Sequence, residues 1–317
     1  MAVRFCNYFH PSLSSFSSSK PYSLTSASPS LPLRASRLSR PRISASSTSS
    51  PIMEFPYVSP PHRDLMVDLL STVETRLDSQ LLPSTLPPDV QSFQNQSGTA
   101  HGSFHIRSGH DSSPIDFILG SWLHCELPTG GALNITSLSS YLNSSTDAPN
   151  FLIELIQSSS TSLILILDLP PRKDLALHPD YLRTFYEDTK LDAPRQTLEI
   201  IPEVKPYFSS SLYIRSVVSP TAITVRIEGD AGDSGRLEEI IKQHLDPIAK
   251  QVLGIWLDQC ASGKREVGES ERAGLENRDK LIKSKTIEID LGSNFPRLFG
   301  REIADRVLGT IQEIFSK

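Results

Sequence analysis

The chain has 317 residues, of which 38% are hydrophobic and 21% are charged, and its formal net charge at pH 7 is −5. This length and composition are typical of a soluble globular protein with one large domain or two modest ones. They argue against a membrane-spanning protein, because no apolar run is long enough, and against a nucleic-acid binder, which needs clustered cations.

The N-terminal segment is rich in Ser and Pro and carries six Lys or Arg residues and no acid before Glu54. This composition is typical of an organellar transit peptide, and the Met-Ala start with many serines favours a plastid. A retained disordered tail is the alternative. We expect cleavage between Arg42 and Met53, with residues 1–48 as the transit peptide and residues 49–317 as one domain in the chloroplast stroma. Removing the six cations from the net charge of −5 leaves −11.

The next segment, SPPHRDLMVDLLSTVETRLDSQLL, predicts an amphipathic helix. Ser59 is a candidate N-cap, and prolines occupy the first turn. One helical stripe is apolar and predicts packing against a core; it consists of Leu65, Met66, Leu69, Leu70, Val73 and Leu77.

Strand-like runs then follow one another, separated by Gly, Pro, Ser and Asp rather than by regular crossover helices. They are SFHIRS, PIDFILGSWLHCEL, NFLIELIQ, LILILDL, SLYIRSVV and AITVRIE. This pattern favours hairpins and a largely antiparallel sheet over a parallel, doubly wound one. A short helix is predicted among the strands in HPDYLRTFYEDTK.

The C-terminal third predicts helices around one more strand. RLEEIIKQHLDPIAKQVLGIWLDQC has a helical apolar face, and a final helix begins near Arg297. The charged segment 263–283 indicates a solvated loop or a frayed helix end. Segment 286–291 alternates as a short strand. The sum is an α/β fold, with a largely antiparallel sheet between helical layers in an α/β/α sandwich.

Sequence motifs for a bound cofactor are absent. There is no glycine-rich phosphate loop, no G-x-S-x-G elbow, no H-E-x-x-H and no cysteine cluster. The densest group of potential metal ligands fits no ligand spacing, so we predict that no metal binds; this group is His101, His105, His110, His124 and Cys125.

Glu154 is an acid inside an apolar segment. If residues 151–157 form a strand, both of its faces are apolar, so the strand is central and Glu154 points into an enclosed space. Desolvation would raise the pKa of this carboxyl group until it holds a proton near neutrality, and a neutral acid in an apolar pocket can donate that proton. The alternative is an ion pair with Arg107 or Arg215 that only stabilises the sheet.

A second candidate acid lies near the C-terminus. In the predicted strand 286–291, Glu288 and Asp290 share one face, and the chain then turns into the final helix. Acids at such a junction often line a cleft. A solvated strand end or a helix cap is the alternative.

Several long strings resemble the red chlorophyll catabolite reductases, and the resemblance extends from Met53 to Lys317. They are MEFPYVSPPHRDLMVDLLSTVE, NFLIELIQSSS, LILILDLPPRKDL, SPTA and FPRLFG. The resemblance implies a fold similar to the ferredoxin-dependent bilin reductases, usually as a homodimer. It also implies reduction of red chlorophyll catabolite, an open-chain tetrapyrrole, to the primary fluorescent catabolite. Reduced ferredoxin would supply the electrons, without a bound metal or flavin.

The same resemblance implies roles for three residues. The family's two functional acids match Glu154, through NFLIEL, and Asp290, through its place before FPRLFG. Glu154 would be a proton donor, and Asp290 a second donor, a relay or a positioning group. Val218, just before SPTA, matches a position where Phe or Val is associated with the C1 epimer that forms. The alternative for Val218 is an ordinary strand residue at a hairpin.

The resemblance also implies macromolecular partners, namely ferredoxin and other enzymes of chlorophyll breakdown in a complex. Ferredoxin is acidic, so docking to this acidic chain would need a local basic patch. The candidates, each of which could instead be a solvated charge run, are Arg278, Lys280, Lys283 and Lys285, or Arg172 with Lys173.

Two other function classes fit parts of the sequence. A non-catalytic tetrapyrrole-binding or shielding protein of the plastid would need the apolar pocket but not the acids. A hydrolase could use Glu154 and Asp290 as an acid pair and would need no electron source.

Overall fold

The computed structural model describes residues 53–128, 130–230, 233–262, 265, 267–292 and 294–316, and it does not describe the side chains of Ser234 and Asp290. The predicted transit peptide, residues 1–48, lies outside these ranges. Within them, no helix combines the length and the apolar character that crossing a membrane requires.

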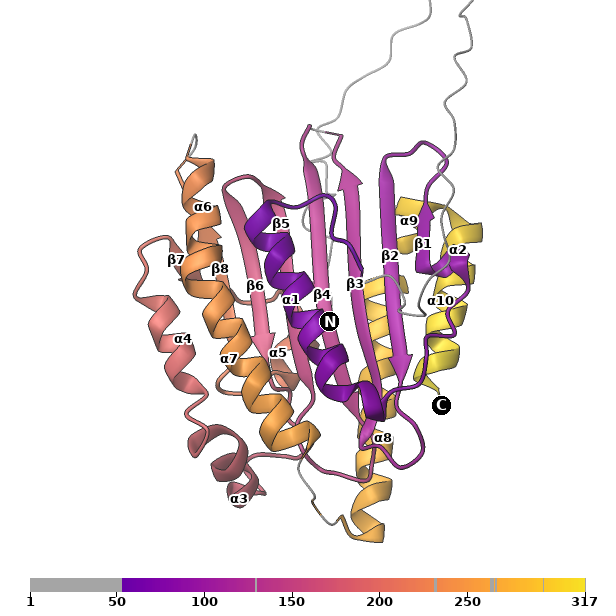
Figure 1. The fold of residues 1–317 in the computed structure, drawn as a ribbon, viewed down its shortest axis with the longest axis vertical. Coiled ribbons are helices and arrows are strands. Elements are labelled where there is room, and N and C mark those ends of the chain that lie inside the picture. Colours follow the sequence, from indigo (N-terminus) through magenta and orange to yellow (C-terminus); the bar gives the residue numbers. More distant parts are fainter. Residues whose placement is uncertain are drawn as a thin grey trace, which may run out of the picture.

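Eight strands in the described part of the chain form one antiparallel sheet, in the order β1-β2-β3-β4-β5-β6-β8-β7 (Figure 1). The antiparallel sheet predicted from the sequence is thereby confirmed. The strands are β1 (Ser92–Gln94), β2 (Ala100–Ser108), β3 (Ile115–Glu126), β4 (Ala132–Leu142), β5 (Phe151–Ser159), β6 (Ser162–Asp168), β7 (Val204–Pro206) and β8 (Ile223–Glu228).

Helices cover both faces of this sheet, as the sandwich prediction requires. In Figure 1, α1, α6 and α7 cross in front of the strands, and α8, α9 and α10 lie behind them. The helices are α1 (Pro60–Leu77), α2 (Pro88–Gln91), α3 (Pro179–Leu182), α4 (Asp192–Glu199), α5 (Leu212–Val217), α6 (Ser234–Ile240), α7 (Asp246–Trp256), α8 (Glu269–Thr286), α9 (Phe295–Phe299) and α10 (Arg301–Phe315). Shorter turns are the 3₁₀ segment Asp78–Gln80 and the π-helical segments Arg183–Glu187, Ile241–Leu245, Leu257–Ala261 and Ile287–Gly292.

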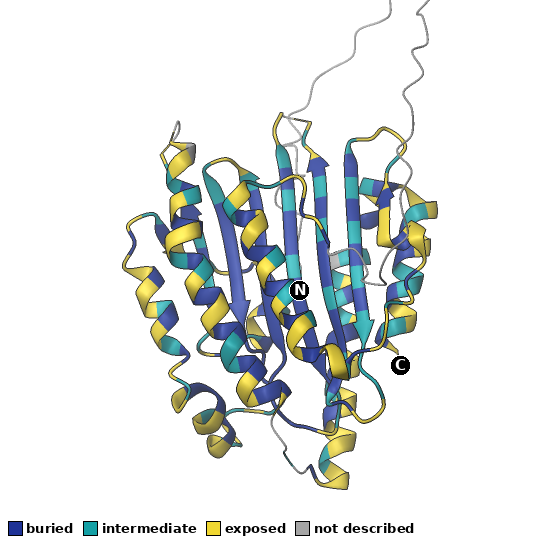
Figure 2. Ribbon diagram, in the orientation of Figure 1, coloured by how far each residue is buried: buried dark blue, intermediate teal, exposed yellow. Residues whose placement is uncertain are grey.

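The core is divided by the sheet into two apolar clusters. On the α1 face, the predicted stripe of α1 packs with Ile153 and Leu155 of β5 and with α6 and α7. On the opposite α10 face, Leu152 and Ile156 of β5 pack with α9 and α10. Every residue from Phe151 to Gln157 is buried, so β5 is the central, doubly covered strand that its sequence predicts. Figure 2 shows the exposed residues concentrated on the outward sides of the helices.

The segment SLYIRSVV is a helix, so the prediction of a strand there is wrong. Ser211 caps α5, and its hydroxyl accepts a hydrogen bond from the backbone N–H of Ile214. A serine N-cap stabilises the first helical turn, and here it outweighs the strand preference of the β-branched residues that follow.

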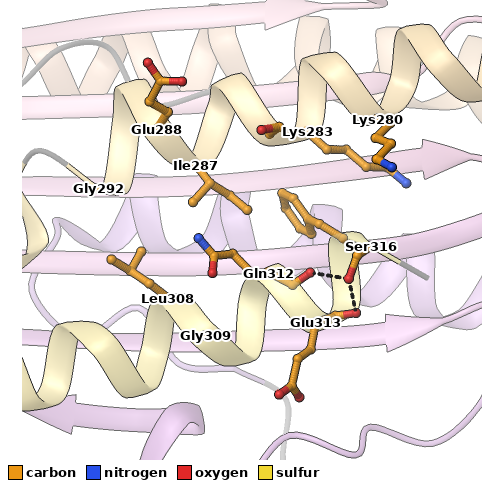
Figure 3. Close-up of a pocket in the computed structure, with 12 residues that line it drawn as sticks. Lys280, Lys283, Ile287, Glu288, Gly292, Leu308, Gly309, Gln312, Glu313 and Ser316 are labelled. Carbon is orange, nitrogen blue, oxygen red and sulfur yellow. Dashed lines mark hydrogen bonds between the residues drawn. The ribbon is translucent and has the colours of Figure 1, made fainter.

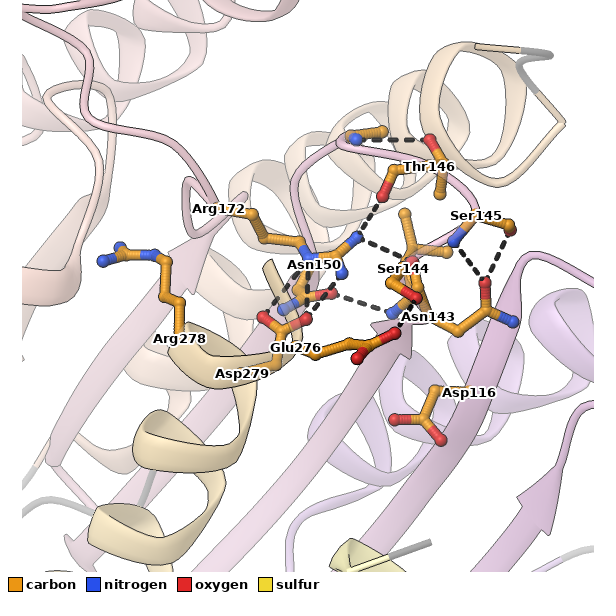
Figure 4. Close-up of polar contacts among 12 residues, drawn as sticks. Asp116, Asn143, Ser144, Ser145, Thr146, Asn150, Arg172, Glu276, Arg278 and Asp279 are labelled. Carbon is orange, nitrogen blue, oxygen red and sulfur yellow. Dashed lines mark hydrogen bonds and ion pairs between the residues drawn. The ribbon is translucent and has the colours of Figure 1, made fainter. Parts of the chain in front are cut away.

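The prediction of a solvated loop or frayed helix end at 263–283 is also wrong, because α8 begins at Glu269 and runs for 18 residues. Besides the buried side chains of Leu275 and Ile282, polar contacts hold it in place. The guanidinium of Arg172, which is fully buried, binds Asp279 of α8 at 2.5 Å and donates to the backbone carbonyls of Asn143 and Thr146 (Figure 4). Arg278 adds a hydrogen bond to the carbonyl oxygen of Pro171.

The predicted short strand 286–291 is instead the π-helical segment Ile287–Gly292, which continues directly from α8. Helical propagation from α8 overrides the short alternating pattern, since extending an existing helix costs no new nucleation. Ile287 is buried in the cluster on the α10 face, so this segment packs over the sheet.

Candidate functional site

Glu154 lies at the middle of the sheet, on the α10 face. It pairs with Ser137 of β4 on one side and with Ile166 of β6 on the other. Its side chain is 1% exposed and lies between Leu152 and Ile156, which face the same way. The location on a doubly covered strand, predicted from the sequence, is confirmed.

The α10 face is not completely covered around Glu154. Leu119, Ser137 and Thr224 lie within strands, share the face of Glu154 through the strand register, and remain partly exposed. On the α1 face, the equivalent strand interior is closed by Ile118, Leu138 and other buried residues. The partly open region over β3 to β8 is therefore the place where a flat apolar ligand could contact Glu154.

Polar groups beside Glu154 form a row across the sheet. The hydroxyl groups of Ser121 and Ser137 lie 2.7 Å apart, and Ser137 is the cross-strand partner of Glu154. A small cavity next to this row reaches α8, and its lining includes Ser139, Leu152 and Ile282. The carboxyl group thus has hydroxyl groups on one side and apolar side chains along its own strand.

A second buried acid, Asp168, lies on the same face at the end of β6 and was not predicted. Ser219 donates to it through its backbone N–H (2.9 Å) and its hydroxyl (2.5 Å). Burial, the dominant effect, raises the pKa of Asp168 to about 6, although the hydrogen bonds from Ser219 oppose the rise. Val218, the residue before Ser219, has an extended backbone and is half-buried, so it lies at the end of α5 rather than in the hairpin strand of the alternative interpretation.

Asp290 is in the π-helical segment after α8, and its side chain lies outside the described part of the structure. Its neighbour Glu288 is exposed and pairs with Lys285 at 2.6 Å. Glu288 also lines a groove of about 720 Å³ between α8 and α10, with Lys280, Leu308 and other residues (Figure 3). The structure therefore places the backbone of Asp290 beside the α10 face and does not test the role of its carboxyl group.

The ion pair proposed as the alternative role of Glu154 does not form with either arginine. Arg107 projects from the α1 face, where it contacts Glu74 and Asp78. Arg215 is exposed on α5, whereas Glu154 is buried. Both arginines are thus separated from the carboxyl group.

The histidines of the candidate metal group contact other residues, and two of them, His101 and His124, lie against the ring of Tyr57. His105 binds Glu74 at 2.6 Å, His124 binds Asn134 at 2.7 Å and stacks on Tyr57, and His110 contacts the carbonyl oxygen of Ser79. Across the described ranges, no three His, Cys, Asp or Glu side chains are arranged to hold a metal ion.

Of the two basic patches considered for docking, the pair Arg172 and Lys173 is wrong. Arg172 is buried against Asp279, and Lys173 pairs with Asp147 at 2.6 Å. In the other patch, Lys283 is buried and pairs with Asp116, while Lys280 is exposed on α8. Any docking through α8 would therefore depend on its exposed cations.

Comparison with known proteins assigns the chain to a family. A family model described as red chlorophyll catabolite reductase matches residues 61–313. The chain belongs to the red chlorophyll catabolite reductase family. By that membership it is an oxidoreductase, and the resemblance seen in the sequence strings is confirmed.

Curated relatives in plants support this assignment. The chain is 54% identical to the red chlorophyll catabolite reductase of Arabidopsis thaliana over 325 residues, which covers 99% of each chain. It is 47% identical to red chlorophyll catabolite reductase 1 of Oryza sativa subsp. japonica, over 86% of this chain and 84% of the relative. Both relatives are named chloroplastic, in agreement with the chloroplast location predicted from the N-terminal composition.

A solved structure supports the fold. The crystal structure of tomato phytochromobilin synthase in complex with biliverdin matches with a TM-score of 0.57 and 18% identity, over 80% of this chain and 84% of that one. At this identity the likeness shows the fold alone. The bilin-reductase-like sandwich predicted from the family resemblance is therefore confirmed.

Proposed function

We propose that this member of the red chlorophyll catabolite reductase family reduces red chlorophyll catabolite to the primary fluorescent chlorophyll catabolite in the chloroplast stroma. Reduced ferredoxin supplies the electrons, and the chain itself binds no metal or flavin. The names of relatives that match nearly the whole chain support this substrate. The position of Glu154, buried beneath a partly open surface of apolar and hydroxyl side chains, is the observation that carries the chemistry.

Glu154 acts as a proton donor in this scheme. Each electron that enters the conjugated pigment makes it more basic, so a proton must then reach a defined carbon atom. Burial of a carboxyl group favours its neutral form, because desolvation penalises the charge. The rigid pairing of β5 with β4 and β6 holds this group in one place, which favours protonation of one carbon atom.

Asp290 is the second functional acid of the proposal. Its backbone belongs to the π-helical segment that packs on the α10 face through Ile287. π-Helical segments occur frequently at functional sites. Asp290 would donate a second proton, relay one to Glu154 or position the pigment, and Val218 would influence the C1 epimer formed.

The electron donor docks at a local basic surface, and the exposed Lys280 on α8 is its first candidate residue. A homodimer and a complex with other enzymes of chlorophyll breakdown complete the proposal. Sedimentation of the purified chain, with and without ferredoxin, measures both the dimer and the donor complex.

The decisive experiment is an anaerobic assay of the chain with red chlorophyll catabolite, with and without reduced ferredoxin, following blue fluorescence. We expect ferredoxin-dependent product from the unmodified chain. Glu154→Gln should lower turnover by about a hundredfold or more, the usual contribution of a general acid, while pigment binding persists. Asp290→Asn tests the second acid, and Glu288→Gln is its control because Glu288 is an exposed acid in the same segment.

The outcomes separate the function classes. Pigment binding without a ferredoxin-dependent product would leave a tetrapyrrole-binding protein, and product formation without an electron source would indicate hydrolysis. Full turnover in Glu154→Gln would remove Glu154 from the proposed mechanism while leaving the reductase activity in place.

A further inference from the structure

Asp168 is a buried acid to which the proposed reaction gives no role. Its side chain is 2% exposed, and it lies on the α10 face on the strand next to Glu154. Glu154 pairs with Ile166, two residues before Asp168. The two acids are therefore diagonal neighbours, and such pairs have Cβ atoms about 7 Å apart in an antiparallel sheet.

Ser219 binds both oxygens of Asp168, and the backbone of Leu169 also donates to this carboxyl group. The backbone N–H of Ser219 donates to Oδ2, and its hydroxyl donates to Oδ1. Both donors are neutral and come from the turn between α5 and β8. A carboxyl group buried among neutral donors stabilises the sheet poorly, since no nearby cation offsets its desolvation. Its specific effect is to fix the chain segment that donates the hydrogen bonds.

That segment is bound to the strand next to Glu154, and the proposed function makes it an edge of the site. Ser219 follows Val218 directly, and its hydroxyl oxygen also accepts from the backbone N–H of Thr221. The turn is thus bound to the end of β6 through Asp168, one strand away from Glu154. If these hydrogen bonds were absent, the position of Val218 relative to Glu154 would depend only on the chain at either end of the turn.

We infer that Asp168 is a positioning residue that acts through Ser219: it fixes the Val218–Ser219 edge of the site and thereby determines how the pigment is oriented above Glu154. The inference rests on the proposed function, because protonation of a trigonal carbon atom creates a stereocentre. Which epimer forms depends on which face of the pigment meets the donor. Asp168 would therefore control the epimer composition without giving up its own proton.

The raised pKa of Asp168 makes proton donation the competing role, so the experiment must separate the two. Asp168→Asn keeps both contacts with Ser219, because an amide oxygen can accept from the N–H and an amide N–H can donate to the hydroxyl. It cannot act as an acid at neutral pH. Asp168→Leu has a similar size and removes both contacts. Ser219→Ala removes only the hydroxyl contact.

Two readouts of the full chain test the inference. The first is the induced circular dichroism of bound red chlorophyll catabolite without any reductant, which reports the orientation of the pigment independently of turnover. The second is the epimer composition of the product by chiral chromatography. Ser211→Ala is the control, because Ser211 caps the same helix α5 and does not contact Asp168. Thermal melting establishes that each variant is folded.

We expect Asp168→Leu to change the induced dichroism and to shift the epimer ratio by about tenfold or more, because each of the two lost hydrogen bonds to a charged group corresponds to at least about that factor. Ser219→Ala should shift both readouts in the same direction, and the double variant should shift them no further than Asp168→Leu. Asp168→Asn and Ser211→Ala should behave as the unmodified chain does.

Two results would overturn the inference. Loss of turnover in Asp168→Asn with an unchanged epimer ratio would make Asp168 a proton donor, and unchanged readouts in Asp168→Leu and Ser219→Ala would make the pair irrelevant to the pigment. If Asp168→Leu does not fold, the readouts of Ser219→Ala and Asp168→Asn alone test whether Asp168 orients the pigment. An unmodified chain that binds pigment but gives no product would refute the proposed function, while the dichroism would still test the orientation.

Discussion

The buried pair of Arg172 and Asp279 gives the most quantitative prediction for the fold. The Arg172 side chain is fully buried and that of Asp279 is 9% exposed. Replacing Arg172 by Met leaves the carboxylate of Asp279 buried without its cation and removes a donor from the carbonyls of Asn143 and Thr146 (Figure 4). We expect the free energy of unfolding to fall by about 3–5 kcal/mol, the cost of removing one partner of a buried ion pair.

Urea denaturation of four variants, Arg172→Met, Asp279→Leu, the double variant and a control, measures this effect. Arg172→Met/Asp279→Leu replaces the whole pair by apolar side chains, so no buried charge is left unpaired. The double variant should therefore be at least about 2 kcal/mol more stable than the sum of the two single effects predicts. Arg195→Met is the control, since Arg195 pairs with Asp192 in an i,i+3 contact on α4 that is partly exposed and should cost less than about 1 kcal/mol. Additive effects of the two single substitutions, or a loss below about 1 kcal/mol in Arg172→Met, would refute the role of the pair as the anchor of α8.

Four further predictions address the core, the buried titratable groups and the site. Leu155→Ala should lower the free energy of unfolding by about 2–5 kcal/mol in urea denaturation, because Leu155 is fully buried. Burial lowers the pKa of His62 to about 4, so the folded state binds fewer protons than the unfolded state between about pH 6.5 and 4. The free energy of unfolding should therefore decrease by up to about 3 kcal/mol as the pH falls from about 6.5 to 4. His62→Gln should remove that part of the pH dependence. For Asp168 the sign is opposite, because its pKa is raised to about 6 in the folded state. Its stabilising contribution is complete below about pH 4 and is lost as the pH rises through 6. Thermal melts at several pH values should show this pH dependence in the unmodified chain and not in Asp168→Asn. Val218→Phe should change the product epimer in chiral chromatography, and unchanged stereochemistry would exclude a role for this position.

The sheet and its first helix could be predicted because their signals are local. The apolar stripe of α1 and the doubly apolar pattern of β5 depend on neighbours within a few residues, and both are found as predicted. β4 was missed although it is central. Its sequence, ALNITSLSSYL, contains many Ser, Thr and Asn residues, which are equally typical of loops, and only its pairing with β3 and β5 selects the extended form.

The errors around α8 have one physical cause. The residues that stabilise this helix lie far away in the sequence, since Arg172 and Asp279 are 107 residues apart. A pattern search sees a charged run, whereas the structure buries two of those charges, Asp279 and Lys283, in ion pairs. Long-range polar anchors leave no periodicity, so neither the helix nor the π-helical continuation to Gly292 could be read from the local sequence.

The candidate site was predicted as far as burial could be inferred from a strand pattern. Glu154 stands out because apolar residues surround it on both sides within one strand. Asp168 satisfies the same criterion less clearly: it ends the run LILILD, where an acid is easily read as the strand boundary. The signal that could have revealed it is Leu169, which is 2% exposed and shows that burial continues past the acid.

The proposed reaction needs a fixed proton donor and a defined orientation of the pigment, and different parts of the fold would provide them. Glu154, the proposed proton donor, lies on β5, whose hydrogen bonds with both neighbours and whose packed faces make any displacement costly. Ser219, beside Val218, is bound to Asp168 by two hydrogen bonds, and the π-helical segment with Asp290 packs through Ile287 and continues from α8, which Arg172 binds at Asp279. A polar contact can be altered by one substitution without changing the packing of the sheet. We therefore expect a substitution at such a contact to change the orientation of the pigment while the position of Glu154 stays constant.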